Sequence, residues 1–385
     1  MNNNAYYTGL KQEAAICGRC GYCRDVCPAY EVGGWETYSP RGKIALAQSV
    51  GDGEAPQKLI DRVYQCTLCG ACREACHVNI DTRQMWLDLR ARAAAAGRAP
   101  EAMNMLRRAV LDTGNISGED QANRLLWSEN LDMPADGLHG REQVDVLYLL
   151  GCVSALFPAA YPIPQAFVQV LAKSGVSFTT AGPDEVCCGF PLLAAGMGGD
   201  MVTLAEKNLA LIERLKPAAI VTTCPSCLHT FQHEYPRILN RPLPAPVMHS
   251  SQYLLRLVQE GKLKFRGSDI KVTYHDPCDL GRNNGTYDEP RAVLRAIPGL
   301  ELVEMERNRE NSLCCGGGGN LEMADKDLAG GISELKVRMI QETGAQTVVT
   351  ACQQCKRTIT SAARKTKLRV KVQDLSEIVL AALED

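Results

Sequence analysis

Short apolar runs alternate with helical patterns over the second half of the chain. Between the runs, apolar positions recur with helical spacing, for example over residues 204–215 and 332–343. Such alternation is typical of parallel strands joined by crossover helices, with ligands bound beyond the carboxyl ends of the strands. We therefore expect an α/β architecture here. The runs rich in valine and isoleucine lie at residues 144–150, 218–223, 270–274 and 347–351.

The first part of the chain shows mainly helical patterns. They predict a mainly α-helical domain over residues 1–99. Residues 100–143 mix helical pieces with turn formers such as Gly114-Asn115 and Pro134, so we interpret them as a linker that packs between domains and carries no chemistry. The helical patterns cover residues 42–50, 57–64, 83–96, 102–111 and 121–130.

Ten cysteines show that the α/β half is duplicated. Each cysteine of the second set lies 126 to 128 residues after its counterpart in the first set. A nearly constant shift over five positions predicts two repeated domains, over residues 144–266 and 267–385. The first set is Cys152, Cys187, Cys188, Cys224 and Cys227, and the second is Cys278, Cys314, Cys315, Cys352 and Cys355.

The flanking residues repeat as well. Val247-Met248-His249 and Val372-Gln373-Asp374 each precede an apolar helix. Because the cysteines follow the predicted strands, we expect the five of each half to converge on one site. A helix beginning after Cys227 or Cys355 would aim its positive end at the thiolates and favour their ionised form.

The remaining eight cysteines form two runs with the spacing C-x2-C-x2-C-x3-C. This is the spacing of bacterial ferredoxins, in which three cysteines of one run and the fourth of the other hold a cubane 4Fe–4S cluster. Structural zinc is the alternative, but zinc sites usually show two C-x2-C pairs separated by a longer loop. His77 follows a complete thiolate set, so we expect it to be a surface or supporting residue. We assign Cys17, Cys20, Cys23 and Cys76 to one cubane, and Cys66, Cys69, Cys72 and Cys27 to the other.

Composition narrows the class of protein. All 18 cysteines of the 385 residues belong to these sets, in a chain too long to need disulfides for stability. The net charge of −2 without a basic block argues against a nucleic-acid partner. Free thiols favour a cytoplasmic location, and the N-terminus lacks the basic and apolar regions of a secretory signal. The charge-free stretch 146–172 contains Gly151 and three prolines, so we expect a strand, a loop and a helix instead of a membrane span.

Glycines follow the adjacent cysteine pair in both repeats. Gly189 and the run 316–319 suit a close approach of the backbone to a bulky cluster. A phosphate-binding loop is the alternative, but the run lacks the lysine and hydroxyl residue of a P-loop. No Gly-x-Gly-x2-Gly loop follows a strand near the start of a fold, so we expect no flavin or NAD site in this chain. A partner would supply that cofactor.

Together these features resemble the family of the heterodisulfide reductase catalytic subunit. The twin five-cysteine sets resemble its CCG domains. The helical ferredoxin domain in front resembles the D-type form, which is equivalent to the C and B polypeptides joined in one chain. The stretches His275-Asp276-Pro277-Cys278-Asp279-Leu280-Gly281-Arg282 and Cys314-Cys315-Gly316-Gly317-Gly318-Gly319 match the second repeat of the family.

The resemblance implies that each five-cysteine set holds a noncubane 4Fe–4S cluster and that a disulfide reacts between the two. Both sets would then be catalytic as cluster ligands: Cys152, Cys187, Cys188, Cys224 and Cys227, and Cys278, Cys314, Cys315, Cys352 and Cys355. Many relatives have histidine directly after the cysteine of His-Asp-Pro-Cys, whereas this chain has Asp279. His275, His229 and His249 are candidates for proton supply, with ordinary packing or hydrogen bonding as the alternative.

The leading hypothesis is an iron–sulfur subunit that passes electrons through two cubane clusters to two noncubane clusters, where a disulfide, thiol or related substrate reacts. A flavoprotein or another iron–sulfur protein would deliver the electrons, and membrane association would occur only through a partner. The alternative is a non-catalytic relay in a flavin-linked dehydrogenase of the glycolate, lactate or glycerol-3-phosphate type, or in an electron-bifurcating complex.

Overall fold

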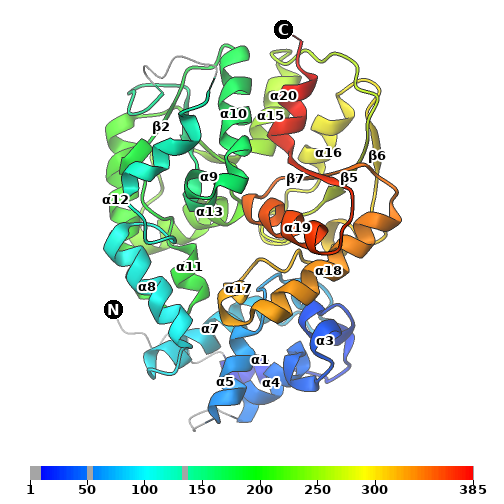
Figure 1. Ribbon diagram of the computed structural model, residues 1–385. Coiled ribbons are helices and arrows are strands. Elements are labelled where there is room, and N and C mark those ends of the chain that lie inside the picture. The colour runs from blue at the N-terminus through cyan, green and yellow to red at the C-terminus, as the bar shows by residue number, and fades with distance from the viewer. Residues whose placement is uncertain (1–9, 50–54, 132–137, 385) are drawn as a thin grey trace.

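The computed structural model of the chain describes residues 10–49, 55–131 and 138–384. The N-terminal stretch Met1–Tyr7, where a secretory signal was not expected, lies outside them, as do Val50 and Pro134. The first part is helical, as expected, and lies below the two sheets in Figure 1. Its helices are α1 (Leu10–Ala15), α2 (Tyr22–Asp25), α3 (Pro28–Gly33), α4 (Pro40–Ser49), α5 (Gln57–Tyr64), α6 (Ala71–Glu74) and α7 (Thr82–Ala95).

The two cysteine runs fold alike. In each run a short helix, α2 or α6, begins after a glycine between the second and third cysteines. Gly21 and Gly70 have φ angles of 93° and 75°, which glycine adopts without steric cost. After the second run, the Asp81 carboxylate accepts a hydrogen bond from the Gln84 N–H and caps α7.

The linker forms α8 (Glu101–Thr113) and a 3-10 helix, η3 (Gln121–Ser128). Two four-stranded sheets follow, with strand orders β2-β1-β3-β4 and β6-β5-β7-β8. Every pairing is parallel, so the predicted α/β class and its duplication are confirmed. The strands are β1 (Val146–Leu149), β2 (Phe178–Thr180), β3 (Ala219–Thr222), β4 (Val247–His249), β5 (Lys271–His275), β6 (Glu301–Val303), β7 (Thr347–Thr350) and β8 (Lys371–Asp374).

Helices cover both sheets and join the two halves. In Figure 1, α10 and α15 of the first half stand beside α20 and α16 of the second, and α10 packs on α20 as α15 packs on α16. The stretch 146–172 contains β1, α9, η4 and all of α10 except its last residue, so the expected strand and helix are present, and two short helical segments occupy the expected loop. The helices are α9 (Gly151–Leu156), η4 (Pro158–Ala160), α10 (Pro162–Lys173), α11 (Phe190–Ala194), α12 (Met201–Leu215), α13 (Pro225–His229), α14 (Tyr235–Leu239), α15 (Ser250–Gln259), α16 (Asp288–Arg295), α17 (Leu321–Ala324), α18 (Lys326–Glu342), α19 (Gln353–Lys365) and α20 (Leu375–Ala382).

One local expectation is wrong. The helices near the last two cysteines of each set begin after Cys224 and Cys352, not after Cys227 and Cys355. In the first half Pro225 occupies the first helical position, where its fixed φ angle and missing N–H favour helix initiation. The first cysteine of each pair is therefore the helix cap, and the second lies in the first turn. Among the described residues, no helix has both the length and the apolar character needed to cross a membrane.

Candidate iron–sulfur cluster sites

Four thiols gather in a cavity of about 110 Å³ near the surface of the helical region. The other lining residues include Ile44, Val78 and His77, whose ring packs edge-on against Tyr22 with 4.5 Å between ring centroids. Burial, and then the neighbouring thiols, raise the pKa of Cys23 to about 11. Mutual repulsion of this kind favours a bound cation among the sulfurs. The four cysteines are Cys17, Cys20, Cys23 and Cys76, of which Cys20 is exposed.

A second group of four thiols lies deeper in the same region. Burial, opposed by Lys43 and assisted by nearby Cys66 and Cys69, raises the pKa of Cys27 to about 12. The pKa of Cys72 is raised by burial and by the thiols of Cys66, Cys69 and Cys27. Cys27 therefore leaves its own run and joins three cysteines of the other. That these two groups hold cubane clusters stays a prediction.

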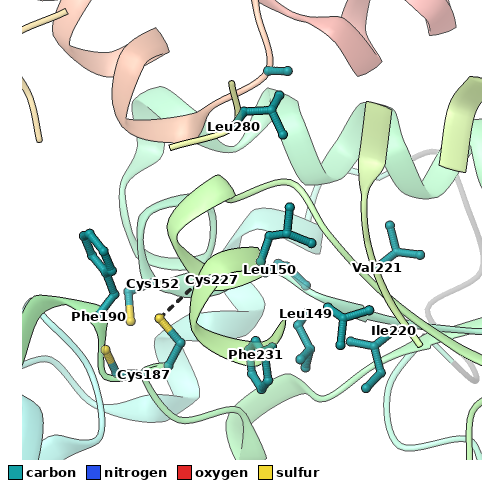
Figure 2. Packing of buried hydrophobic residues seen from close by; sticks show 14 of the residues in the cluster. Leu149, Leu150, Cys152, Cys187, Phe190, Ile220, Val221, Cys227, Phe231 and Leu280 are labelled. Atoms are coloured by element: carbon teal, nitrogen blue, oxygen red, sulfur yellow. Dashed lines mark hydrogen bonds between the residues drawn. The ribbon is translucent and has the colours of Figure 1, made fainter. Parts of the chain in front are cut away.

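The first five-cysteine set forms a continuous row of thiols. Side-chain contacts join Cys152 to Cys187, Cys187 to Cys188, and Cys227 to Cys224. The sulfurs of Cys188 and Cys227 are 3.4 Å apart. Figure 2 shows Cys152 and Cys187 side by side next to Phe190. The five cysteines of the first half therefore lie together, although they come from the ends of different elements.

Backbone and charged groups enclose this first set. Gly151 has φ +76°, and a Cβ there would lie 3.2 Å from the sulfur of Cys227. The Glu185 carboxylate accepts hydrogen bonds from the N–H groups of Leu150 (3.0 Å) and Gly151 (2.7 Å). Arg124 lies 3.3 Å from that carboxylate and donates a 3.3 Å hydrogen bond to the sulfur of Cys152. Because Arg124 belongs to η3, the linker contributes a side chain to the surroundings of this set, and the expectation that it carries no chemistry stays untested.

The second five-cysteine set repeats the row of thiols. Contacts run from Cys278 to Cys314, from Cys314 to Cys315, and from Cys315 through Cys355 to Cys352. Gly316, Gly318 and Gly319 pack against backbone. A Cβ at Gly316 would lie 2.6 Å from the carbonyl oxygen of Ala329, and one at Gly319 would lie 2.6 Å from that of Cys66. The glycine run therefore lets the segment that follows Cys315 pack directly against the loop around Cys66.

A junction joins the helical region to the second set. The Cys69 thiol contacts the Cys314 thiol. The second group of four thiols in the helical region (the second ferredoxin group: Cys27, Cys66, Cys69 and Cys72) and the second five-cysteine set therefore meet through sulfur atoms. Arg282 holds both sides of this contact, because its Nε donates to the carbonyl of Cys69 (2.6 Å) and its Nη1 to that of Ser312 (2.7 Å). Arg282 belongs to a stretch that resembles the family, but no sequence pattern indicated this bridging role.

The two five-cysteine sets face each other across a polar contact. Only Cys224 and Cys278 of the ten thiol-bearing residues are partly exposed, and the other eight are buried. Ser226, two residues after Cys224, donates a 2.6 Å hydrogen bond to Oδ2 of Asp279, the residue after Cys278. Asp279 Oδ1 accepts a 2.6 Å bond from Asn283. The accessible ends of both sets therefore lie on segments that touch.

Gln353 ties the two sets together more deeply. Its side chain is fully buried at the start of α19, directly after Cys352. Its Nε2 donates to the Leu150 carbonyl (2.5 Å) and the Thr223 hydroxyl (2.8 Å), and its Oε1 accepts from the N–H of Ser154 (3.0 Å). A residue of the second half thus fixes the backbone on both sides of Cys152. No sequence pattern singled it out.

The three candidate histidines occupy different surroundings. His249 accepts a hydrogen bond from the Ser251 N–H and caps α15, as Asp374 caps α20, so its hydrogen-bonding role is ordinary. Burial lowers its pKa to about 3. Burial, with Arg83 nearby, lowers the pKa of His229 to about 4. His275 is 1% exposed, lies within 4.8 Å of the sulfurs of Cys315 and Cys355, and has no hydrogen-bond partner on either ring nitrogen among the described residues.

These donor sets suit iron–sulfur clusters. They consist of cysteine sulfur, the usual protein donor to such clusters, and most of the thiols are shielded from water. Gly151 leaves room beside the Cys227 sulfur that a side chain would fill. Buried thiols pressed against one another, with raised pKa values at Cys23, Cys27 and Cys72, are costly to ionise without a bound cation.

Comparison with known proteins defines the class. The cysteine-rich CCG domain family matches residues 146–232 and 272–360, and the 4Fe-4S dicluster domain family matches residues 13–80. The chain is therefore an iron–sulfur protein with a dicluster domain followed by two CCG domains. A hypothetical protein from Helicobacter pylori of known structure has a TM-score of 0.52 at 9% identity, over 85% of this chain and 64% of that one, which is a likeness of fold.

Three relatives make the assignment more specific. The D polypeptide of the dihydromethanophenazine:CoB–CoM heterodisulfide reductase of Methanosarcina mazei is 34% identical over 96% of this chain and 94% of its own length. A probable membrane-anchored ferredoxin of Chromohalobacter salexigens is 31% identical over 96% of this chain and 60% of its own length. The EtfAB:quinone oxidoreductase of Syntrophomonas wolfei is 28% identical over 96% of this chain and 58% of its own length. The chain belongs to the D-type heterodisulfide reductase family and is an iron–sulfur oxidoreductase subunit.

Proposed function

We propose that the chain carries electrons through two cubane 4Fe–4S clusters to two noncubane 4Fe–4S clusters, where a disulfide or related substrate is reduced. The cubanes are held by the two groups of four cysteines and the noncubane clusters by the two sets of five. The contact between Cys69 and Cys314 carries this proposal, because it leaves no intervening residue between the second ferredoxin group and the second set. In this proposal the domains divide at residues 99, 143 and 266.

When bound, the clusters supply one-electron carriers, and together the paired sets deliver two electrons to one substrate. Reduction of a disulfide consumes two electrons and two protons, breaks the S–S bond and releases two thiols. The protein contributes access and shielding. Cys224 and Cys278 are the partly exposed members of their sets, so a substrate reaches the sets from the side where Ser226 binds Asp279.

A partner delivers the electrons at the opposite end. Cys20 is exposed, and its neighbours Ile16 and Tyr22 are 52% and 54% exposed. The first ferredoxin group is thus accessible from outside, whereas Cys69 and Cys72 of the second group are buried. A flavoprotein or another iron–sulfur protein fits this position, since the sequence offers no flavin loop of its own.

One observation favours a second candidate, an electron relay without substrate chemistry. Asp279 stands at the position where many relatives have histidine. Its two carboxylate oxygens accept hydrogen bonds from Ser226 and Asn283, and it lies 3.8 Å from Arg83. It therefore ties two segments together and has no free donor to offer a leaving thiolate. The relatives named a quinone oxidoreductase and a membrane-anchored ferredoxin accord with a relay.

Metal analysis and a reductase assay on the anaerobically prepared chain test the proposal. Four clusters require about 16 iron atoms and as much acid-labile sulfide per chain. With an artificial donor, the loaded chain should reduce a heterodisulfide, and Cys278→Ala should abolish this while leaving the cubane signals intact. Full iron content without turnover of any disulfide would contradict the reductase and support the electron relay. Zinc in place of iron would overturn both candidates.

A further inference from the structure

The two five-cysteine sets have the same backbone register but different surroundings. Tyr148 pairs with Val221 in the first sheet as Tyr274 pairs with Val349 in the second. One residue further, Leu149 lies opposite Thr222, and its equivalent His275 lies opposite Thr350. The strand that leads to the first set thus ends in an alkyl side chain, and the strand that leads to the second ends in a buried imidazole.

The helices that follow the adjacent cysteine pairs differ in the same way. Asn208 of α12 and Lys336 of α18 occupy equivalent buried positions, with 1% and 0% exposure. The Asn208 amide donates to the hydroxyl of Tyr235 (2.8 Å) and to the carbonyl of Cys187 (3.4 Å). The Lys336 ammonium donates only to the sulfur of Met305 (3.6 Å) among the described residues. It interacts electrostatically with Asp276 and, next in strength, with Cys314 and Cys315.

Two more differences act in the same direction. The fourth residue after the first cysteine of each set is Leu156 in the first half and Arg282 in the second. The second residue before the cysteine pair is the buried Glu185 in the first half and Ser312 in the second. A positive charge is thus added, and a negative charge removed, around the second set.

Other charges nearby offset one another in part. At the first set, Arg124 is paired with Glu185 at 3.3 Å, so the pair is neutral overall. At the second set, Arg291 binds the Asp276 carboxylate (2.6 and 2.8 Å) and also the Glu304 carboxylate (2.6 and 2.8 Å), so this triad carries one net negative charge. Lys336 has no carboxylate within salt-bridge distance in the described part of the chain, and Arg282 binds backbone carbonyls. Asp279, beside Cys278, has Arg83 at 3.8 Å to offset its charge. The two charges of Lys336 and Arg282 exceed the one negative charge of the triad, so the net excess around the second set is positive.

We propose that Lys336 and Arg282 give the cluster of the second set a higher reduction potential than that of the first set. Reduction adds negative charge to a cluster, and a buried cation stabilises that charge strongly where the dielectric constant is low. An electron that arrives through Cys69 therefore reduces the cluster of the second set first, and the cluster of the first set is reduced only afterwards. This inference rests on the proposed function, because it requires both sets to hold clusters.

Redox titration followed by EPR tests the proposal on the loaded, full-length chain. Lys336→Asn gives the second set the residue of the first, and Lys336→Met removes the charge at nearly constant volume. Either variant should lower the ratio of reduced to oxidised second-set cluster at fixed potential by about tenfold. The reciprocal Asn208→Lys should raise that ratio for the first-set signal alone.

A matched control separates charge from general disturbance. Arg338 lies two residues from Lys336 on the same helix and is exposed, so Arg338→Asn removes the same charge and should shift no signal. Equal shifts in Arg338→Asn and Lys336→Asn, or no shift in either Lys336 variant, would overturn the proposal. Iron and sulfide content are measured on every sample, so that missing clusters, which contradict the proposed function, are distinguished from clusters with equal potentials.

Discussion

Replacing Arg90 should loosen the attachment of the helical region to both sheets. Arg90 lies on α7, is fully buried, and directs its guanidinium at backbone carbonyls. It donates to Val63 and Cys66 of the helical region, to Ala194 of the first half (2.7 Å), and to Gly319 of the second half (2.8 Å). A single side chain thus connects three parts of the molecule.

The energetic cost follows from those carbonyls. Arg90→Met keeps the length of the side chain but leaves five carbonyls, those of Val63, Tyr64, Cys66, Ala194 and Gly319, without this donor, and each such loss costs about 1–3 kcal/mol. Removing a buried charge returns several kcal/mol of desolvation energy, which offsets part of that cost. We expect a net loss on the order of 4 kcal/mol. The loss should concentrate at the junction between Cys66 and the glycines of residues 316–319.

Hydrogen exchange on the loaded protein, with cluster reduction followed by EPR, measures this effect. In Arg90→Met the amides of residues 63–69 and 316–321 should exchange faster, and the five-cysteine clusters should be reduced more slowly than the cubanes. Arg108→Met is the matched control, because Arg108 is 58% exposed and pairs with the exposed Glu101. If Arg90→Met exchanges and melts like Arg108→Met, the reasoning about the junction is refuted.

Three further predictions concern the sites themselves. Gly151→Ala should prevent cluster binding at the first set and lower the iron content by about four atoms per chain, because the new Cβ would lie 3.2 Å from the Cys227 sulfur. Gly199→Ala is the control: the space around Gly199 is open, so this variant should keep its full iron content. Gln353→Leu should lose three hydrogen bonds between the halves, about 3 kcal/mol or more, and speed amide exchange at Ser154; a fully active and equally protected variant would contradict this. Burial lowers the pKa of His249 to about 3 in the folded chain, whereas in the unfolded chain it binds a proton near pH 6.5. The free energy of unfolding should therefore be highest above pH 6.5 and fall as the pH drops below it. His249→Asn keeps a helix cap and should lose less thermal stability between pH 7 and 5, and an unchanged acid sensitivity would count against this role.

Much of the molecule follows from local sequence. The cysteine runs, the strand at 347–350 and the helix at 57–64 are predictable because ligand spacing and apolar periodicity are local properties. The repeat offset also indicated that residues such as His249 and Asp374 are equivalent, and both cap helices. The start of α13 differs from the expected one, because Pro225 at the first helical position sets it directly after Cys224 and not after Cys227.

The order of residues alone predicts how the thiols are grouped and that two parallel sheets carry ten of them. It does not predict that Cys69 meets Cys314, that the linker sends Arg124 to Cys152, or that Lys336 lies beside the second set. Arg282 and Cys69 are 213 residues apart. Contacts across such separations leave no periodic trace in the chain, because they arise only when distant surfaces pack together. The iron–sulfur class therefore follows from the cysteine spacing, whereas the electron path that we propose between the sites depends on the packing.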